Sequence, residues 1–209
     1  MNWLTLVISL GISTAALASP PNRLDEIQAE LTSFRPDIPE VAVGYAFDYF
    51  RKYESLFQNS NFITVIDFTA SSRKRRMHKI DLTTGEVEDL LVAHGKNSGE
   101  DIATHFSNRI GSDMSSLGVY LTLDSYFGEH GLSLLLRGLE STNSNAETRA
   151  IVLHGAAYVT DEIAATRPRL GRSLGCPAVD LKFSEDLVKL LRGGSLIYAY
   201  SNLAPESEL

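Results

Sequence analysis

The sequence predicts a mainly β domain with accessory helices near its two ends, and three observations lead to this fold class. Between residues 62 and 200, short runs rich in β-branched and aromatic residues alternate with turns of glycine and small polar residues. Apolar residues recur at helical spacing mainly outside that region, at 24–50, and late within it, at 184–191. The 209 residues, 44% of them hydrophobic, are enough for one domain with a sizeable core.

The first element, residues 1–18, has the pattern of a secretory signal peptide. An apolar run begins at Leu4 and ends in Ala16-Leu17-Ala18, a small-residue cleavage pattern. The only positive charge before the run is the terminal amine, so an uncleaved anchor is the alternative, although the run is short for a membrane span. We expect export to the periplasm or the medium, with no stable membrane insertion after cleavage.

Residues 19–60 are expected to form a helical segment. Apolar residues at helical spacing over 24–31 are followed by Pro36 and Pro39, which separate them from a second apolar helix over 39–50. The pattern is typical of a packing segment without chemistry. It leaves open whether the segment packs on the rest of the chain or docks elsewhere.

The remaining elements form the expected β-rich domain, residues 61–201, followed by a tail at 202–209. A basic turn at 71–76 reads as a solvated hairpin end, with contact to an anionic polymer or membrane as the alternative. Strands are expected at 62–68, 77–82, 87–92, 119–123, 131–136, 149–153 and 195–200, with a helix at 184–191 that has Ser184 as its N-cap.

The formal net charge of −7 argues against a nucleic-acid partner, which would require a basic surface. The five histidines lack the spacing of a helical zinc motif, and one cysteine cannot build a structural zinc site. We therefore expect neither a metal nor a cofactor, and a monomeric protein.

The only cysteine, Cys176, lies in Gly-Arg-Ser-Leu-Gly-Cys-Pro at 171–177. Pro177 favours extended backbone at the cysteine, and Gly175 permits close approach of a ligand. Such an elbow could expose a nucleophilic thiol beside the backbone N–H groups of residues 175 and 176 as oxyanion donors. An inert buried cysteine is the alternative.

The best candidate for a base is His154, which follows an expected buried strand and precedes Gly155. Arg169 and Arg172 would favour the thiolate electrostatically. The histidine precedes the cysteine along the chain, and no Cys-Gly-x-Cys-Trp sequence is present, which disfavours a papain-type hydrolase.

The pairing of Leu-His-Gly at 153–155 with Ser-Leu-Gly-Cys at 173–176 resembles the murein L,D-transpeptidase catalytic domain family, a YkuD-like branch. Similar blocks occur at 66–68, 92–100, 106–108, 115–120, 130–134 and 149–159, so the resemblance covers roughly residues 60 to 200. It implies an L,D-transpeptidase-type β-sandwich with the cysteine and histidine at one end of the sheets.

The resemblance also implies roles for residues. Cys176 would be the nucleophile, His154 the base, and Ser173 and Gly175 part of the elbow that forms the oxyanion hole. The substrates would be peptidoglycan stem peptides: a thioester forms at the diamino acid, D-alanine leaves, and an amine accepts the acyl group in a 3→3 crosslink. Water as acceptor would make the protein an L,D-carboxypeptidase, and a non-catalytic murein-binding domain is the further alternative.

Two positions depart from the commoner family pattern, which has His where this chain has Leu174 and Arg or Asn where it has Ala178. The contact to the stem carboxylate must then come from elsewhere, such as Arg172 or Arg149. Gly155 and the polar loop residues His94, Asn97 and Ser98 are further substrate-binding candidates. For the loop, a purely structural role around its glycines is an equal alternative.

Overall fold

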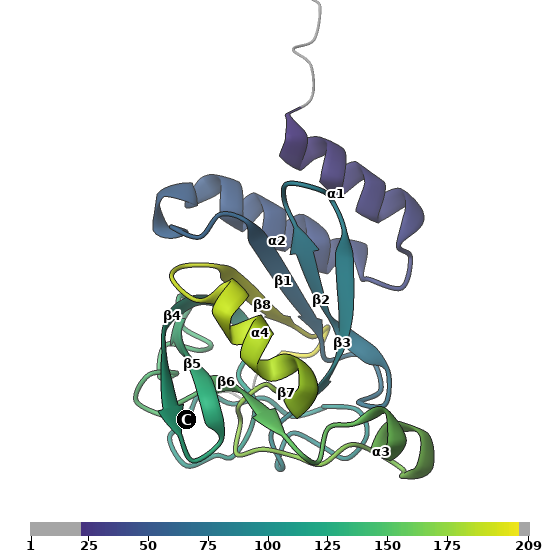
Figure 1. Cartoon of the computed structure of the whole chain (residues 1–209), viewed down its shortest axis with the longest axis vertical. Coiled ribbons are helices and arrows are strands. Elements are labelled where there is room, and N and C mark those ends of the chain that lie inside the picture. The colour runs from purple at the N-terminus through teal and green to yellow at the C-terminus, as the bar shows by residue number, and fades with distance from the viewer. Residues whose placement is uncertain (1–21, 205–209) are drawn as a thin grey trace, which may run out of the picture.

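The computed structural model describes residues 22–204 of the chain. Eight strands form a closed barrel in the order β1-β2-β3-β7-β6-β5-β4-β8, with helices at one end and on the flank (Figure 1). The strands are β1 (Phe62–Asp67), β2 (Arg75–Asp81), β3 (Val87–Ala93), β4 (Gly118–Gly128), β5 (Gly131–Gly138), β6 (Val152–Ala156), β7 (Ala178–Asp180) and β8 (Leu196–Tyr200). The helices are α1 (Arg23–Phe34), α2 (Glu40–Lys52), α3 (Asp161–Thr166) and α4 (Leu181–Leu191), with a 3-10 turn η1 (Glu54–Leu56) after α2.

The predicted mainly β fold with N-terminal helices is confirmed. The first and last strands, β1 and β8, pair in parallel with Ile63 opposite Leu196, and this pairing closes the barrel. A second parallel pair, β6 with β7, sets His154 opposite Ala178, and the other neighbouring strands run antiparallel. The two layers of the expected sandwich are therefore continuous with each other.

The barrel interior is filled by alternate residues of the strands, because successive side chains of a strand point to opposite faces. These side chains form one hydrophobic cluster, to which Ile66, Leu134 and Leu153 belong. Helix α4 adds Leu187 and Leu191 to it.

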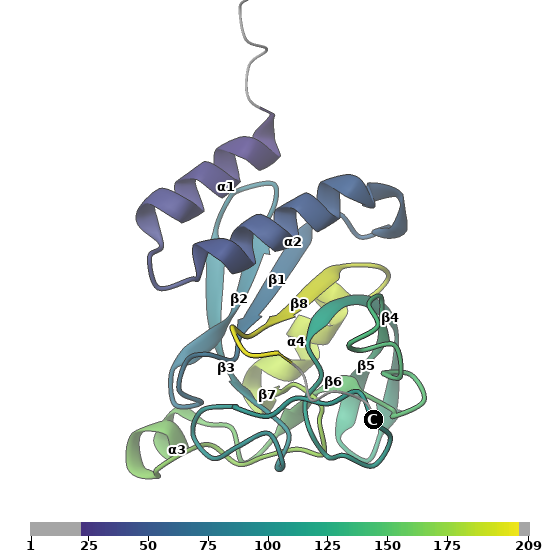
Figure 2. The ribbon, with the colours of Figure 1, turned by 180° about the vertical axis from the view of Figure 1, so that it is seen from behind.

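Helices α1 and α2 lie together at one end of the molecule, across β1 and β8, as Figure 2 shows from behind. Their buried residues, among them Ile27 and Phe47, share one cluster with Ile63 and Leu196 on the outer side of the barrel. Asn22 caps α1 by accepting a hydrogen bond from the backbone N–H of Asp25 at 3.0 Å. Of the two alternatives left by the sequence, the helical segment packs on the barrel.

One helix and one strand have bounds that differ notably from the expected ones, and a further strand was not expected. Helix α4 begins at Leu181, with the side chain of Asp180 accepting from the N–H of Lys182, so Ser184 lies inside the helix and is not its N-cap. The strand expected at 149–153 begins at Val152, because residues 141–150 form turns. Strand β7 was missed, since three residues after a proline carry no periodic pattern.

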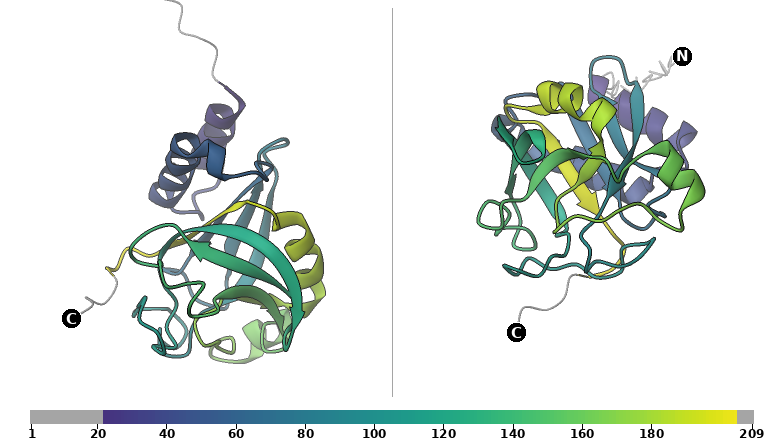
Figure 3. Two further views of the ribbon diagram at one scale, coloured as in Figure 1. Left: turned by 90° about the vertical axis from the view of Figure 1, so that its left-hand side faces the viewer. Right: turned by 60° about the horizontal axis from the view of Figure 1, so that its bottom comes forward.

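No helix within residues 22–204 is long and apolar enough to span a membrane. The expected signal peptide, 1–18, lies outside the described residues, as do 205–209 of the expected tail. Loops and turns gather at the end of the barrel opposite α1 and α2, which comes forward in the right-hand view of Figure 3.

Candidate active site

A cleft of about 500 Å³ contains both the cysteine and the histidine singled out by the sequence. Its walls come from the tip of the β4–β5 hairpin, the start of β6 and the elbow before β7. The lining residues are Tyr126, Glu129, His130, Arg149, Ala150, Val152, His154, Tyr158, Arg172, Ser173, Leu174 and Cys176.

The parallel pairing of β6 with β7 brings the thiol and the imidazole into this cleft. His154 lies opposite Ala178, two residues beyond the cysteine, and its backbone N–H donates to the carbonyl of Pro177 at 3.3 Å. The backbone N–H of Val152 points at Cys176 Sγ, 3.4 Å away. Because Val152 and His154 are two residues apart on one strand, their side chains share the face turned to the cleft.

The orientation of His154 is fixed by its own strand. Its Nδ1 lies 3.0 Å from the carbonyl oxygen of Gly155, so Nδ1 carries the proton and donates it, leaving the Nε2 lone pair free. Burial lowers the pKa of His154 below its ordinary value, and the neighbouring His130 lowers it further, against the opposing effect of the Gly155 carbonyl. A neutral imidazole with a free Nε2 can accept a proton.

The thiol is also neutral at rest. Burial raises the pKa of Cys176 above its ordinary value, while the N–H of Val152 and the charge of Arg149 act in the opposite direction. The directions of both pKa shifts favour thiol and neutral imidazole over a preformed thiolate–imidazolium pair. The proton would leave sulfur as the nucleophile attacks, which is general-base catalysis.

The elbow around the cysteine is held by Ser173. Its hydroxyl donates to the carbonyl of Cys176 at 2.6 Å and accepts the N–H of Gly175 at 3.1 Å. That second bond departs from the expectation that Gly175 supplies an oxyanion donor, because its N–H already has a partner. The N–H of Cys176 makes no hydrogen bond to any residue in 22–204 and remains available.

Glycine is required at position 175. The residue has φ of +121°, and a Cβ there would lie 2.7 Å from the carbonyl oxygen of Met114 and 2.9 Å from the guanidinium of Arg149. Both the backbone conformation and the close contacts therefore exclude a side chain.

Of the arginine candidates, Arg149 is the cation whose charge acts on the thiol. Its guanidinium donates to the carbonyl of Ser107 at 2.8 Å, to the hydroxyl of Ser116 at 3.1 Å and to the carbonyl of Met114. All of these partners are neutral. Burial lowers the pKa of Arg149, and the nearby Asp113 acts in the opposite direction.

Arg172 and Arg169 lie differently from the expectation that they favour the thiolate. Both pair with Glu100, at 2.9 Å and 2.6 Å. Arg172 also donates to the carbonyls of Lys96 and Gly99 and keeps part of its side chain on the cleft wall, whereas Arg169 does not line the cleft.

The polar loop at 93–100 supports the elbow and does not line the cleft. The carbonyl of His94 accepts the N–H of Ser173 at 3.0 Å, and the N–H of Lys96 donates to the carbonyl of Ser173 at 2.8 Å. None of His94, Asn97 and Ser98 lines this cleft, and the contacts of the loop are those of the structural alternative.

Each of those three loop residues is engaged elsewhere. His94 is buried, with Nδ1 2.7 Å from the guanidinium of the buried Arg76. Ser98 is buried and accepts the N–H of Ser115, and the amide of Asn97 donates to the carbonyl of Ser112.

Gly155 does not line the cleft either. A Cβ at that position would meet the hydroxyl of Ser184 at 2.4 Å, so tight packing against α4 explains the glycine. Its contribution to the site is the carbonyl that orients His154.

Sequence reasoning missed the contribution of the β4–β5 hairpin. The imidazole of His130 stacks on that of His154, with centroids 4.3 Å apart and an interplanar angle of 21°. Tyr126 and Glu129 line the cleft from the same hairpin. The only available signal in the sequence is the His-Gly pair at 130–131.

Within residues 22–204, one group of side chains could hold a metal: Asp37, His78 and Asp89 place ligand atoms within 4.8 Å of one another. Arg35 donates to both carboxylates, at 2.7 Å and 2.9 Å, and so already supplies the positive charge that they require. His78 is buried, and its Nδ1 donates to Asp89 at 2.6 Å.

A thiol, a neutral imidazole and a free backbone N–H in one cleft are the parts of a thiol acyl-transfer site. Comparison with known proteins adds the family. Residues 35–200 match the L,D-transpeptidase catalytic domain, and the chain belongs to that family. No individual curated sequence matches it significantly.

The chain is similar to several solved structures. One is an L,D-transpeptidase from Mycobacterium smegmatis, which is 10% identical, with a TM-score of 0.43 over 68% of this chain and 59% of that one. L,D-transpeptidase 1 of Mycobacterium tuberculosis is 12% identical, with a TM-score of 0.37 over 68% and 62% of the two chains. A protein of Bdellovibrio bacteriovorus is 14% identical, with a TM-score of 0.42 over 70% and 49%. This chain thus matches about three fifths or less of these structures.

Proposed function

We propose that the protein is an exported cysteine acyltransferase that acts on peptidoglycan stem peptides. The observation that carries this proposal is the shared cleft of Cys176 and His154, with Nδ1 of the imidazole held by the Gly155 carbonyl. Membership of the L,D-transpeptidase catalytic domain family supports the substrate class.

In the acylation step, Cys176 Sγ attacks the carbonyl carbon of the diamino acid while Nε2 of His154 takes the thiol proton. The N–H of Cys176 donates to the developing oxyanion, and Arg149 adds positive charge to the same wall. Collapse of the intermediate breaks the peptide C–N bond, and the imidazolium returns the proton to the amine of the departing D-alanine.

In the second step, the amine of another stem peptide attacks the thioester. His154 accepts a proton from this amine, the new amide forms, and the sulfur leaves and is reprotonated. The product is a 3→3 crosslink. With water in place of the amine, the same steps give a trimmed tripeptide, which is L,D-carboxypeptidase activity.

Export places this reaction in the periplasm or outside the cell, where its polymer lies, and we propose that the protein acts there as a monomer. The segment 1–18 is proposed to be its signal peptide, 19–60 a structural helical segment and 61–201 the catalytic domain.

The decisive experiment incubates the protein with purified tetrapeptide muropeptides and measures product masses. We expect a crosslinked dimer and free D-alanine from the wild type, and neither from Cys176→Ala at an unchanged melting temperature. A tripeptide without dimer would identify the carboxypeptidase, and binding without any product a murein-binding domain. Wild-type turnover by Cys176→Ala would exclude the mechanism.

A further inference from the structure

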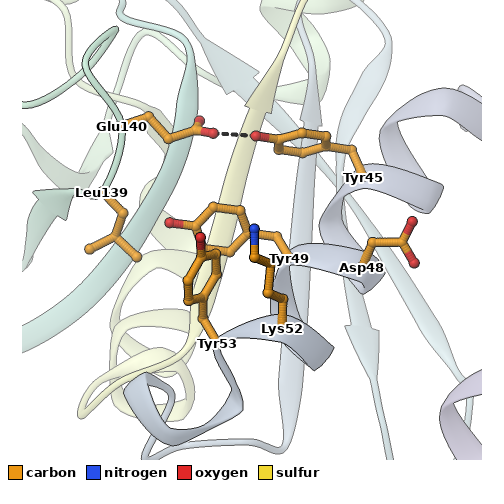
Figure 4. A pocket seen from close by; sticks show the side chains of 7 residues that line it. All are labelled: Tyr45, Asp48, Tyr49, Lys52, Tyr53, Leu139 and Glu140. Atoms are coloured by element: carbon orange, nitrogen blue, oxygen red, sulfur yellow. Dashed lines mark hydrogen bonds between the residues drawn. The ribbon is translucent and has the colours of Figure 1, made fainter.

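A second pocket lies between α2 and the end of β5 and shares no lining residue with the cleft. It measures about 360 Å³, near the lower end of the range of small-molecule sites, about 300–1,000 Å³. Its lining residues, drawn in Figure 4, are Tyr45, Asp48, Tyr49, Lys52, Tyr53, Leu139 and Glu140.

Tyr45 forms a fixed aromatic wall of this pocket. One side of its ring stacks on Tyr198, with centroids 4.9 Å apart and an interplanar angle of 29°. Its hydroxyl donates to Glu140, whose other oxygen accepts the backbone N–H of Val119 at 2.7 Å (Figure 4). Although held at both ends, Tyr45 is 42% exposed, so a ligand could contact the ring without ordering it first.

Polar groups surround this aromatic wall. Tyr49 and Tyr53 lie with ring centroids 4.6 Å apart, and the ammonium of Lys52 is 5.0 Å from the centroid of Tyr53. Burial raises the pKa of Tyr45 and Tyr49, with Glu140 adding to the effect, so both phenols stay protonated at neutral pH. The pocket therefore offers hydroxyls that donate and accept, together with one ammonium donor.

The formal charges at the pocket nearly balance. Asp48 pairs with Arg51 at 3.1 Å, which leaves the carboxylate of Glu140 and the ammonium of Lys52 as one negative and one positive charge. The pocket therefore has no excess of either sign with which to bind a strongly charged ligand. An uncharged ligand with an apolar face and a polar edge fits both the aromatic rings and the surrounding hydroxyls.

We propose that this pocket binds an uncharged pyranose ring, an N-acetylated amino sugar of the glycan strand. A pyranose has C–H groups on its faces, which pack on aromatic rings, and hydroxyl and amide groups at its edge, which match the surrounding donors and acceptors. The binding of a pyranose is argued from the pocket itself. Its assignment to the glycan strand rests on the proposed function, because the stem peptides of peptidoglycan are attached to a strand of such sugars. The pocket would hold the polymer while the cleft processes the peptide, and this raises the effective peptide concentration.

The test is calorimetric titration of the full-length protein with the trisaccharide of N-acetylglucosamine. We expect saturable binding, weakened at least tenfold by Tyr45→Ala, which removes the aromatic wall. Tyr53 is an exposed residue of the same pocket, so Tyr53→Ala should also weaken binding. This variant replaces Tyr45→Ala as the test if Tyr45→Ala fails to fold. The matched control is Phe34→Ala, which removes an aromatic side chain 79% exposed on α1, outside the pocket, and should leave binding unchanged.

The titration is repeated with Cys176→Ala, so that its outcome is independent of turnover. Absence of saturable binding to the wild type, or equal binding by Tyr45→Ala and Tyr53→Ala, would overturn the proposal even if the enzyme crosslinks muropeptides. Binding that persists in a protein without peptide turnover would leave the sugar site intact and refute the proposed function alone. Displacement of the sugar by a free stem peptide would assign the pocket to peptide and also overturn the proposal.

Discussion

Two His-Gly pairs flank the cysteine elbow, and their histidines do different things. His94 directly follows β3, and His154 lies in β6. Strand β7, which follows the elbow, pairs with both of these strands. His94 turns to the buried Arg76, and burial together with that charge lowers its pKa to about 4. His154 turns to the cleft with a free Nε2. The same dipeptide thus places one imidazole against a buried guanidinium and the other in the cleft, where the proposed function makes it the base.

The largest expected effect separates these two roles. His154→Gln removes the base, so kcat/KM on muropeptides should fall by about 10²–10⁴-fold with little change in melting temperature. His94→Gln keeps an acceptor for Arg76 and should retain most of the activity while losing about 1–3 kcal/mol of unfolding free energy. Both are measured by product mass spectrometry and thermal unfolding. Loss of activity in His94→Gln at full stability would contradict the comparison.

The next effect concerns acid stability. The unfolded chain protonates His94 near its ordinary pKa of 6.5, whereas the folded protein protonates it only near 4. Between these values the unfolded state binds the extra proton, so stability falls as pH falls, by about 3 kcal/mol at full protonation. Denaturant unfolding at pH 7 and pH 4 should show this loss in the wild type and a smaller loss in His94→Gln. Identical losses would show that His94 is not the group responsible.

A smaller effect should follow from removing the stacked imidazole. His130→Ala removes the imidazole that lowers the pKa of His154 and also exposes His154 to water, so the pKa of His154 should rise. The acidic limb of the kcat/KM profile should then move to higher pH, with less than about a tenfold loss at the optimum. His130→Phe keeps a stacked ring that cannot titrate and should restore part of the rate at the optimum. An unmoved acidic limb in His130→Ala would refute the coupling.

The smallest effect is expected at the loop that supports the elbow. Asn97→Ala removes one hydrogen bond, to the carbonyl of Ser112, and no group of the cleft. Activity should change by less than about twofold, and the free energy of unfolding by about 1 kcal/mol. A large rise in KM for stem peptides would return Asn97 to the substrate-binding residues.

The sequence predicted those features that depend on local pattern. Alternating and β-branched runs identified most of the strands, and the glycine-flanked surroundings of Cys176 and His154 indicated two residues that lie in one cleft. The pairing of β6 with β7 was not foreseeable, because β7 is only Ala178–Asp180 and its register comes from partners far along the chain. The role of His130 also depends on a tertiary contact, the stacking on His154 across the cleft.

The polar loop illustrates a different limit. Glycines and side-chain donors at 93–100 are as compatible with binding a ligand as with binding backbone. The imidazole of His94 is oriented by a contact with the buried Arg76, which β2 contributes from elsewhere in the sequence. A sequence pattern can thus indicate that a loop is specialised without revealing what it contacts.

The parallel pairing of β1 with β8 also has a consequence for how the chain folds. Strand β8 lies between β1 and β4, so both of these keep unpaired edges until residues 196–200 are present. A chain made from its N-terminus onward therefore cannot close the barrel until residue 200 is available, and contacts this distant in sequence form slowly. Until then the strands beside the Cys176 elbow belong to an open sheet with unpaired edges, and such a sheet is prone to aggregation.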